Sequence, residues 1–317
     1  MSSTQLDAEA IARLSLHAPA HFGIQHSQTI HRLELLQRWN IPLGSKVLEL
    51  GCGQGDCTTV LASAVGEEGS VVAVDPADLD YGESSRPSNH AEEESSQLMT
   101  RAGSPFTLGQ AQGHISQGPL GGRITWVQQS PHDYLSSLPS PSDSDSKAFD
   151  VAVLAHSLWY FASPSLIVST FHALKQHSKR LLLAEWSLVA THPSAQPHVL
   201  AVLTQAALEC RKPQGSSKSN VRTVLSPKRL AELALEAGWQ LQSETRVQCG
   251  EGLFDGQWEV YACLDPSFTK QVEELVTDER ERAVVFATRD ACEASLEGVQ
   301  GGRKGVRSMD VWVSSFV

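Results

Sequence analysis

The sequence predicts an α/β fold in which a mostly parallel sheet carries helices on both faces. Short apolar segments typical of strands alternate with segments of helical periodicity, which is the pattern that βαβ units produce. A glycine-rich loop follows the first strand, at the edge where open α/β sheets bind their ligands. The run at 180–186 is almost continuously apolar, as expected of a strand that is covered on both faces.

The individual elements follow from periodicity and from capping residues. A helix is expected over 27–39, because apolar residues recur there at helical spacing, and a Pro-Leu-Gly turn at 42–44 separates it from the first strand. Two Ser-Pro pairs, at 163–164 and 226–227, favour helix starts, and Gly238 ends the second of these helices. The expected strands are 46–50, 70–75, 124–128, 150–155, 180–186, 239–248 and 309–316.

The chain is expected to form a single domain over residues 1–317, with 1–40 as an N-terminal helical lid. Two segments, 187–225 and 250–305, exceed the simple alternation and are interpreted as helical cap insertions that recognise the substrate. The second contains a long amphipathic pattern (Phe268, Val272, Leu275, Val276, Ala283 and Phe286). Three stretches with little to bury are expected to be solvated loops (82–104, 138–147 and 213–220).

The charge balance argues against a polyanionic partner. Lys and Arg number 25 against 36 Asp and Glu, which gives a net charge of −11, whereas a protein that neutralises phosphates needs an excess of cations. No apolar run approaches the ~20 residues that span a bilayer, and the N-terminus lacks the features of a signal peptide. We therefore expect a cytoplasmic protein that acts on a small molecule, with neither nucleic acid nor a membrane as partner.

The sequence does not indicate a metal site. The six cysteines are scattered without a CxxC pair, as is usual for reduced thiols in cytosolic enzymes. Several histidines near the N-terminus share a helical face, but no Cys or carboxylate joins them to complete a coordination set. These histidines are His17, His21, His26 and His31.

The loop at 51–55 carries the most specific signal. Its three glycines follow a strand and precede a helix, an arrangement that makes a tight turn and lets a ligand approach backbone N–H groups. Asp75 ends the second strand, where a carboxylate can accept both hydroxyls of a ribose. A dinucleotide site would place its third glycine at the position of Asp56, whose charge would face the pyrophosphate. The loop therefore favours a nucleoside with an amino-acid end, and Glu49 is a candidate for orienting its ammonium group.

This ordered set resembles the class I S-adenosylmethionine-dependent methyltransferases. The resemblance starts from Glu-x-Gly-x-Gly-x-Gly at 49–55 with an acid at the end of the second strand, and it covers roughly residues 20–250. It continues through 127–131, 149–150, 174–175 and 180–187. The segments HFGIQ at 21–25 and HSLWY at 156–160 are similar to small-molecule methyltransferases of fungal secondary metabolism. The family implies a doubly wound, Rossmann-like sheet of seven strands in the order 3-2-1-4-5-7-6, with the last strand antiparallel.

By the same resemblance, the chain binds S-adenosylmethionine as methyl donor, releases S-adenosylhomocysteine and uses no metal. The residues implied in cofactor binding are Glu49, Gly51, Cys52 and Gly53 beside the methionine portion, Asp75 on the ribose, Pro76, Ser130 and Pro131 beside the adenine, and Ala155 and His156 after the fourth strand. One departure from the family is the sequence Gln-Ser-Pro at 129–131, where Gly-Asp-Ala is common and the acid meets the adenine amino group. Ser130 offers an uncharged and therefore weaker contact, and Asp133 is the alternative acid.

The residues on the acceptor side allow more than one interpretation. His156 lies just past the fourth strand, and it is interpreted as a general base, as a contact in the cofactor pocket or as a packing residue. Trp159 and Tyr160 either line an aromatic acceptor pocket or pack the helix that follows. His21 and Gln25 precede the first helix of the fold. They either belong to a lid that closes over the cofactor and binds the substrate, or they cap the surface.

Together these observations predict in-line transfer of a methyl group to a small, aromatic or apolar metabolite. Alignment of the reactants supplies most of the rate acceleration, and a base is needed only where the acceptor loses a proton. Two alternatives stay open: a methyltransferase-like regulator that binds protein partners, and an enzyme that keeps the cofactor but catalyses a cyclisation or elimination. The chain is expected to be a monomer or a homodimer.

Overall fold

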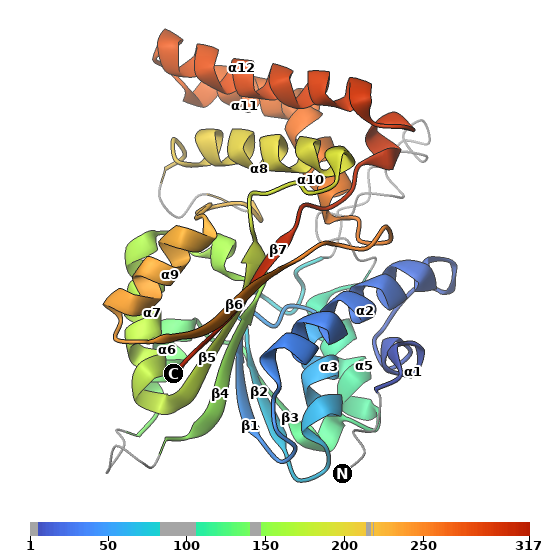
Figure 1. Cartoon of the computed structure of the whole chain (residues 1–317), viewed down its shortest axis with the longest axis vertical. Helices are drawn as coiled ribbons and strands as arrows, with labels where there is room; N and C mark the ends of the chain where they lie inside the picture. The colour runs from blue at the N-terminus through green and yellow to red at the C-terminus, as the bar shows by residue number, and fades with distance from the viewer. Residues whose placement is uncertain (1–5, 83–105, 140–146, 214–216, 218) are drawn as a thin grey trace. The chain divides into compact units, whose positions relative to one another are not determined.

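The computed structural model describes residues 6–82, 106–139, 147–213, 217 and 219–317. Its strands form one sheet in the order β3-β2-β1-β4-β5-β7-β6 (labelled in Figure 1), which confirms the fold class and the strand order. The strands are β1 (Lys46–Leu50), β2 (Ser70–Val74), β3 (Ile124–Val127), β4 (Phe149–Ala155), β5 (Ser178–Trp186), β6 (Leu241–Val247) and β7 (Val311–Phe316). Strand β1 pairs in parallel with β2 and β4, β2 pairs in parallel with β3, and β7 runs antiparallel to β6.

The chain divides into two compact units. The first consists of the described residues up to Ala155 together with 173–182 and Val317, and the second consists of 156–172 and 183–316. Strand β5 and helix α7 (Pro164–His177) each contribute residues to both units. The expectation of a single domain over 1–317 stays a prediction.

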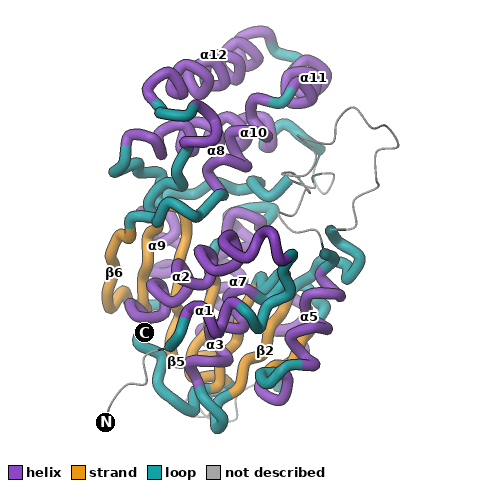
Figure 2. Tube along the Cα trace, turned by 90° about the vertical axis from the view of Figure 1, so that its right-hand side faces the viewer, coloured by secondary structure: helices purple, strands orange, loops and turns teal. Residues whose placement is uncertain are grey.

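A helical layer covers one side of the strands in the first unit (Figure 2). It is built from α1 (Ala8–Ala12), α2 (Phe22–Trp39) and α3 (Asp56–Val65), which contact one another. The predicted apolar face of α2 is buried at Leu33, Leu36 and Trp39, whereas Ile30 is 48% exposed. Helix α2 starts earlier than predicted and ends where Asn40 adopts a left-handed conformation with φ 48°. This unit also contains α5 (Leu108–Gln117) and α6 (Pro131–Ser137).

The second unit contains the two segments that were interpreted as cap insertions. Segment 187–225 forms α8 (Gln196–Glu209), and segment 250–305 forms α10 (Asp255–Leu264), α11 (Pro266–Leu275) and α12 (Glu279–Ser295). These four helices pack together at one end of the second unit, while α9 (Pro227–Glu236) lies beside β6 (Figure 1). Short 3-10 helices occupy Pro19–His21, Gly121–Arg123, Leu158–Tyr160, Pro193–Ala195, Leu296–Gly298 and Gly302–Gly305.

The long amphipathic pattern in 250–305 is divided between two helices. The backbone leaves the helix at Val276, and the Asp278 carboxylate then caps α12 by accepting the N–H groups of residues 280 and 281. The sequence pattern included Phe286, but on α12 the fully buried side chain of this cluster is that of Val285. The cluster that results contains Leu208, Phe268, Val272, Val276 and Val285.

The three expected loops lie largely outside the described residues. None of the helices that the structure describes is long and apolar enough to cross a membrane.

Candidate active site

The glycine loop adopts the conformation for which its glycines were singled out. Gly51, Gly53 and Gly55 have φ angles of 81°, 50° and 95°, values that residues with a Cβ rarely adopt. The N–H groups of Gly51 and Cys52 both donate to the carbonyl of Val74, at 2.8 and 3.3 Å. The end of β2 therefore holds the start of the loop.

The carboxylate of Asp75 fixes the loop from the next strand. Its Oδ2 accepts the N–H of Gly53 and its Oδ1 accepts the N–H of Ala77, both at 2.9 Å. Because each carboxylate oxygen has two lone pairs, each oxygen keeps one for a further donor. The position predicted to bind a ribose diol thus has the acceptors that two hydroxyls need.

The two later glycines of the loop differ in the space around them. A Cβ built on Gly53 would meet no heavy atom within 4 Å, whereas one on Gly55 would lie 2.7 Å from the Trp126 ring. Gly55 is therefore required by packing, while Gly53 leaves open space next to the Asp75 carboxylate. Gln112 of α5, which the sequence did not single out, donates from Nε2 to the Gly53 carbonyl at 2.8 Å and holds the loop from the other side.

Glu49 faces the interior of the first unit. Its side chain is buried, and its Oε2 accepts a hydrogen bond from the Thr58 hydroxyl at 2.6 Å. Burial raises the pKa of Glu49 to about 7, against the opposing effect of the hydrogen bonds from Thr58 and Cys57. Burial likewise raises the pKa of Cys52 well above its ordinary value, so this thiol is a poor nucleophile.

The residues expected beside the adenine are partly engaged in helix capping. Ser130 is the N-cap of α6: its hydroxyl accepts the N–H of Asp133 at 3.1 Å and donates to the Asp133 carboxylate at 2.7 Å. Pro131 occupies the first helical position, and Pro76 is exposed. Asp133 is exposed as well, so the alternative acid is accessible.

The N-terminal segment docks on the helix that follows the glycine loop. Gln25 donates from Nε2 to the carboxylate of Asp56 at 2.9 Å, and it is half-buried. His21 is exposed at the start of α2. The structure therefore gives Gln25 an anchoring contact, and the lid role of both residues stays a prediction.

His156 opens the second unit directly after β4. Its backbone N–H donates to the carbonyl of Ala184 at 2.8 Å, and its φ of 55° lies in the left-handed region that non-glycine residues seldom adopt. The side chain is 12% exposed, and Nδ1 lies 3.8 Å from Oε1 of Glu185. Strained backbone of this kind concentrates at functional sites, which makes His156 a stronger candidate than its position alone suggested.

Glu185 and Trp186 form the surroundings of His156. The buried Glu185 carboxylate accepts the backbone N–H groups of Leu158 and Trp186, both at 3.0 Å. The ring of Trp186 lies 4.4 Å from the His156 ring, centroid to centroid. Neither residue was singled out in the sequence, although an acid inside the apolar run 180–186 was a usable signal.

The two aromatic candidates differ in exposure. Trp159 is buried, and its indole N–H donates to the Leu225 carbonyl at 3.2 Å, which favours the packing interpretation. Tyr160 is 46% exposed. A contact of either residue with the acceptor stays a prediction.

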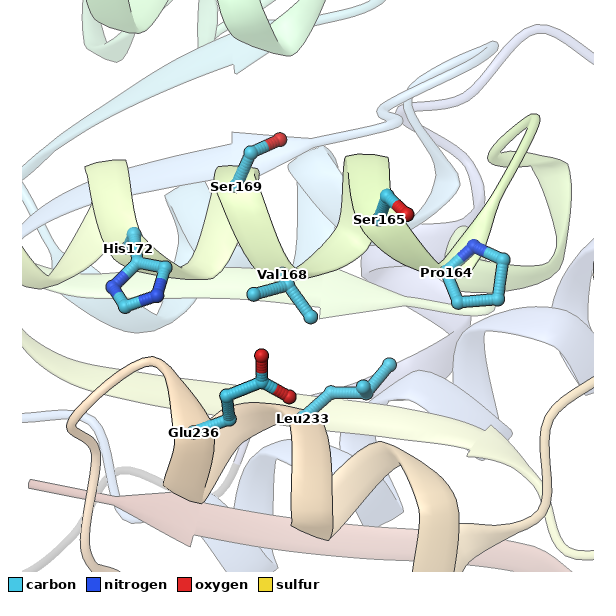
Figure 3. A pocket seen from close by; sticks show the side chains of 7 residues that line it. All are labelled: Pro164, Ser165, Val168, Ser169, His172, Leu233 and Glu236. Atoms are coloured by element: carbon cyan, nitrogen blue, oxygen red, sulfur yellow. The ribbon is translucent and has the colours of Figure 1, made fainter.

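A groove of about 340 Å³ opens between α7 and α9 in the second unit. Figure 3 shows Val168 and His172 of α7 facing Leu233 and Glu236 of α9. None of the residues predicted for the site lines this groove, and nothing connects it with the chemistry. Among the described residues, no group of three or more His, Cys, Asp or Glu side chains is placed to hold a metal ion.

A sheet of this order, with a glycine loop after β1 and an acid after β2, defines the class of α/β proteins that bind S-adenosylmethionine. The family model described as "Methyltransferase domain" matches residues 24–244, well over half of the chain. The chain belongs to this methyltransferase family, and it is a class I S-adenosylmethionine-dependent methyltransferase. The regulatory alternative therefore loses its support.

Relatives and solved structures agree with this assignment. The methyltransferases phomM′ and phomM of Diaporthe leptostromiformis are each 26% identical over 303 residues, which is 86% of this chain and 73% of theirs. The crystal structure of a cyclopropane-fatty-acyl-phospholipid synthase-like protein from Lactobacillus casei is 30% identical, with a TM-score of 0.76 and 98% coverage of both chains.

Proposed function

We propose that this enzyme transfers a methyl group from S-adenosylmethionine to a small, aromatic or apolar metabolite, with His156 as the base. The observation that carries the proposal is the pairing of a strained His156 with the buried Glu185 carboxylate, 3.8 Å from Nδ1. The two fungal methyltransferases similar to this chain support a role in secondary metabolism. A small-molecule acceptor, a monomeric or homodimeric state and a metal-free reaction belong to the same proposal.

The first unit would hold the cofactor. We place the ribose on Asp75, whose two oxygens each keep a free lone pair, and the methionine portion against Gly51, Cys52 and the open space at Gly53. Glu49 would act on the ammonium group from within the interior. Pro76, Ser130 and Pro131 are proposed beside the adenine, and Ala155 and His156 near the reacting end. When bound, S-adenosylmethionine supplies an electrophilic methyl group on a sulfonium.

His156 and Glu185 would supply the acid–base chemistry. We assign the proton transfer to Nε2 of His156, which would take a proton from an acceptor hydroxyl while Nδ1 lies on the side of Glu185. The Glu185 carboxylate would stabilise the imidazolium that results, in the way an acid orients and supports a catalytic histidine. Its two backbone hydrogen bonds hold it in place for this role.

The surroundings of His156 support an apolar or aromatic acceptor. The buried ring of Trp186 lies against His156 and makes its surroundings apolar. Tyr160 has the exposure that a substrate contact would need, and Trp159 would act only through its packing. Gln25 and His21 are proposed as a lid, with Gln25 anchored to Asp56.

A second candidate comes from the solved structure of the synthase-like protein, which resembles this chain over nearly its whole length. Its name concerns cyclopropane fatty-acyl phospholipids, so the alternative acceptor is a carbon–carbon double bond of an acyl chain. Such a reaction transfers the methyl carbon to the double bond and then removes one of its protons to close the ring. His156 would take that proton.

Two experiments test the proposal, and the second separates the two candidates. Titration calorimetry with S-adenosylmethionine and S-adenosylhomocysteine, and with NAD as control, tests the cofactor. Incubation with trideuteromethyl-labelled donor and a panel of phenols and unsaturated lipids, followed by mass spectrometry, tests the acceptor. A methylated phenol retains all three deuterium atoms, whereas a cyclopropane retains two. If both sulfur ligands fail to bind, the proposal is wrong.

A further inference from the structure

His198, in the first turn of α8, carries a buried hydrogen-bond donor for which the described residues offer no acceptor. The side chain is fully buried, and its Nδ1 accepts the backbone N–H of Met309 at 3.0 Å. Because Nδ1 is the acceptor, the proton of the neutral ring lies on Nε2. Burial, followed by the influence of His156, lowers the pKa of this imidazole to about 3. In the part of the chain that the structure describes, Nε2 has no hydrogen-bond partner.

The location of this donor connects it with the proposed chemistry. Buried polar groups are nearly always paired in folded proteins, so this N–H indicates a partner that the described residues do not provide. The His198 ring packs edge-on against Trp186, with ring centroids 5.0 Å apart. Trp186 also contacts His156. The donor therefore lies one side chain away from the proposed base.

We propose that the Nε2–H of His198 donates a hydrogen bond to an uncharged oxygen of the methyl acceptor. This makes His198 a substrate-binding residue, and the inference rests on the proposed function, which it deepens. The ring is neutral, so it brings no positive charge to compensate a carboxylate. The buried Glu185 carboxylate beside His156 also disfavours a second negative charge. The acceptor class is therefore an aromatic compound with a ketone, ester or neutral hydroxyl.

Two substitutions separate the donor from the structural role of the ring. In His198→Asn, the side-chain oxygen can still accept the Met309 N–H near the position of Nδ1, but no donor reaches the position of Nε2. In His198→Gln, the amide N–H₂ reaches that position and replaces the donor, while the acceptor near Nδ1 is lost. A role in folding alone would make the Asn variant the milder one, whereas a role in binding makes the Gln variant the milder one.

The test uses two phenols that differ in one group, which is a neutral acetyl group in one and a carboxylate in the other. The full chain is saturated with S-adenosylhomocysteine and titrated by calorimetry with 4-hydroxyacetophenone and with 4-hydroxybenzoate. We expect the ketone to bind at least about tenfold more tightly than the carboxylate. His198→Asn should weaken ketone binding by about tenfold, whereas His198→Gln should stay within roughly threefold of the unchanged chain.

Several results would overturn the inference. It fails if the carboxylate binds as tightly as the ketone, or if His198→Asn binds the ketone normally. It also fails if His198→Asn changes only the thermal midpoint, because a buried water would then be the partner of Nε2. Binding of S-adenosylhomocysteine without either phenol refutes this inference and leaves the cofactor part of the proposed function intact. Absence of S-adenosylhomocysteine binding refutes both.

Discussion

Two backbone N–H groups converge on the carboxylate of Asp75, so Asp75→Asn tests both the loop geometry and the ribose site. An amide has only one acceptor oxygen and no charge, so it cannot satisfy Gly53, Ala77 and a ribose together. We expect affinity for S-adenosylhomocysteine to fall roughly 10–100-fold, as for the loss of charged hydrogen bonds. Calorimetry measures the change, with the exposed Asp80→Asn as the matched control. Equal affinity in both variants would place the ribose elsewhere.

His156→Asn tests the proposed base. Asn tolerates the left-handed backbone that His156 adopts, so the turn should be retained. We expect turnover of a phenol to fall by about 10²–10⁴-fold, with affinity for S-adenosylhomocysteine unchanged. The residual rate should increase with pH, because the phenol then ionises without help toward its pKa of about 10.

The control for this prediction is His172→Asn, at an exposed histidine in the groove between α7 and α9. This variant should turn over like the unchanged chain. If His156→Asn lost cofactor affinity and kept its turnover, His156 would be a pocket contact and not a base. A fall in turnover for His172→Asn would instead connect the groove with catalysis.

The sequence singled out candidate residues that belong to a local motif and did not single out those whose contacts depend on distant packing. Asp75 and Gly53 could be singled out because a glycine loop after one strand and an acid at the end of the next strand form a local pattern. Gln112 and His198 were not, since each acts through a contact with a residue far away in the sequence. Glu185 is an intermediate case. The sequence shows an acid inside an apolar strand, but it does not show which groups donate hydrogen bonds to that carboxylate.

Among the elements, the loop between β1 and α3 yields a prediction in which two glycines behave differently. Gly55 has φ 95°, and a Cβ there would lie 2.7 Å from Trp126 and 2.8 Å from Ile115. We expect Gly55→Ala to destabilise the fold by about 1–3 kcal/mol through strain and overpacking. Urea unfolding measures this cost.

Gly53→Ala is the matched partner, because its Cβ would enter open space at a φ of 50°. This variant should unfold closer to the unchanged chain than Gly55→Ala does, yet bind S-adenosylhomocysteine more weakly, since the methyl group occupies the space proposed for the cofactor. Two results together would contradict the proposed position of the methionine portion. They are an equal loss of stability in both variants and an unchanged affinity of Gly53→Ala for S-adenosylhomocysteine.

The regular elements of the sheet were predicted to within one or two residues at most ends, because strand and helix periods are local properties. The cap was harder. Its amphipathic pattern continues through 268–286 almost without interruption, and the break at Val276 comes from the Asp278 cap and from packing on Leu208 of α8. Tertiary contacts therefore decided where one helix ended and the next began.

Each of the two compact units contains a carboxyl group whose pKa is raised to about 7. Glu49 is buried in the first unit, where desolvation is the main cause. Glu259 lies on α10 of the second unit, and its Oε2 accepts a hydrogen bond from Gln205 of α8 at 2.7 Å. Loss of solvation and the nearby Asp255 raise the pKa of Glu259. The ordinary value for both is 4.5.

These groups make the stability of the protein depend on pH in a definite direction. An acid whose pKa is higher in the folded state binds more protons when folded, so its ionisation penalises the folded state increasingly as the pH rises from about 4.5 to about 7. For the fully buried Glu49, the penalty above that range is on the order of 3 kcal/mol. Replacement by Gln removes the penalty and keeps an acceptor for Thr58.

We therefore expect Glu49→Gln and Glu259→Gln to match the unchanged chain near pH 4.5 and to become progressively more stable than it as the pH rises to about 7. Urea unfolding at a series of pH values measures the difference in the free energy of unfolding between each variant and the unchanged chain. The titration of His198 affects stability in the opposite direction, but it is common to all these proteins and therefore cancels in the difference. Because β5 contributes residues to both units, both variants should move one common transition. Two transitions, each moved by only one variant, would show that the units unfold separately, and a difference that is independent of pH would refute the raised pKa values.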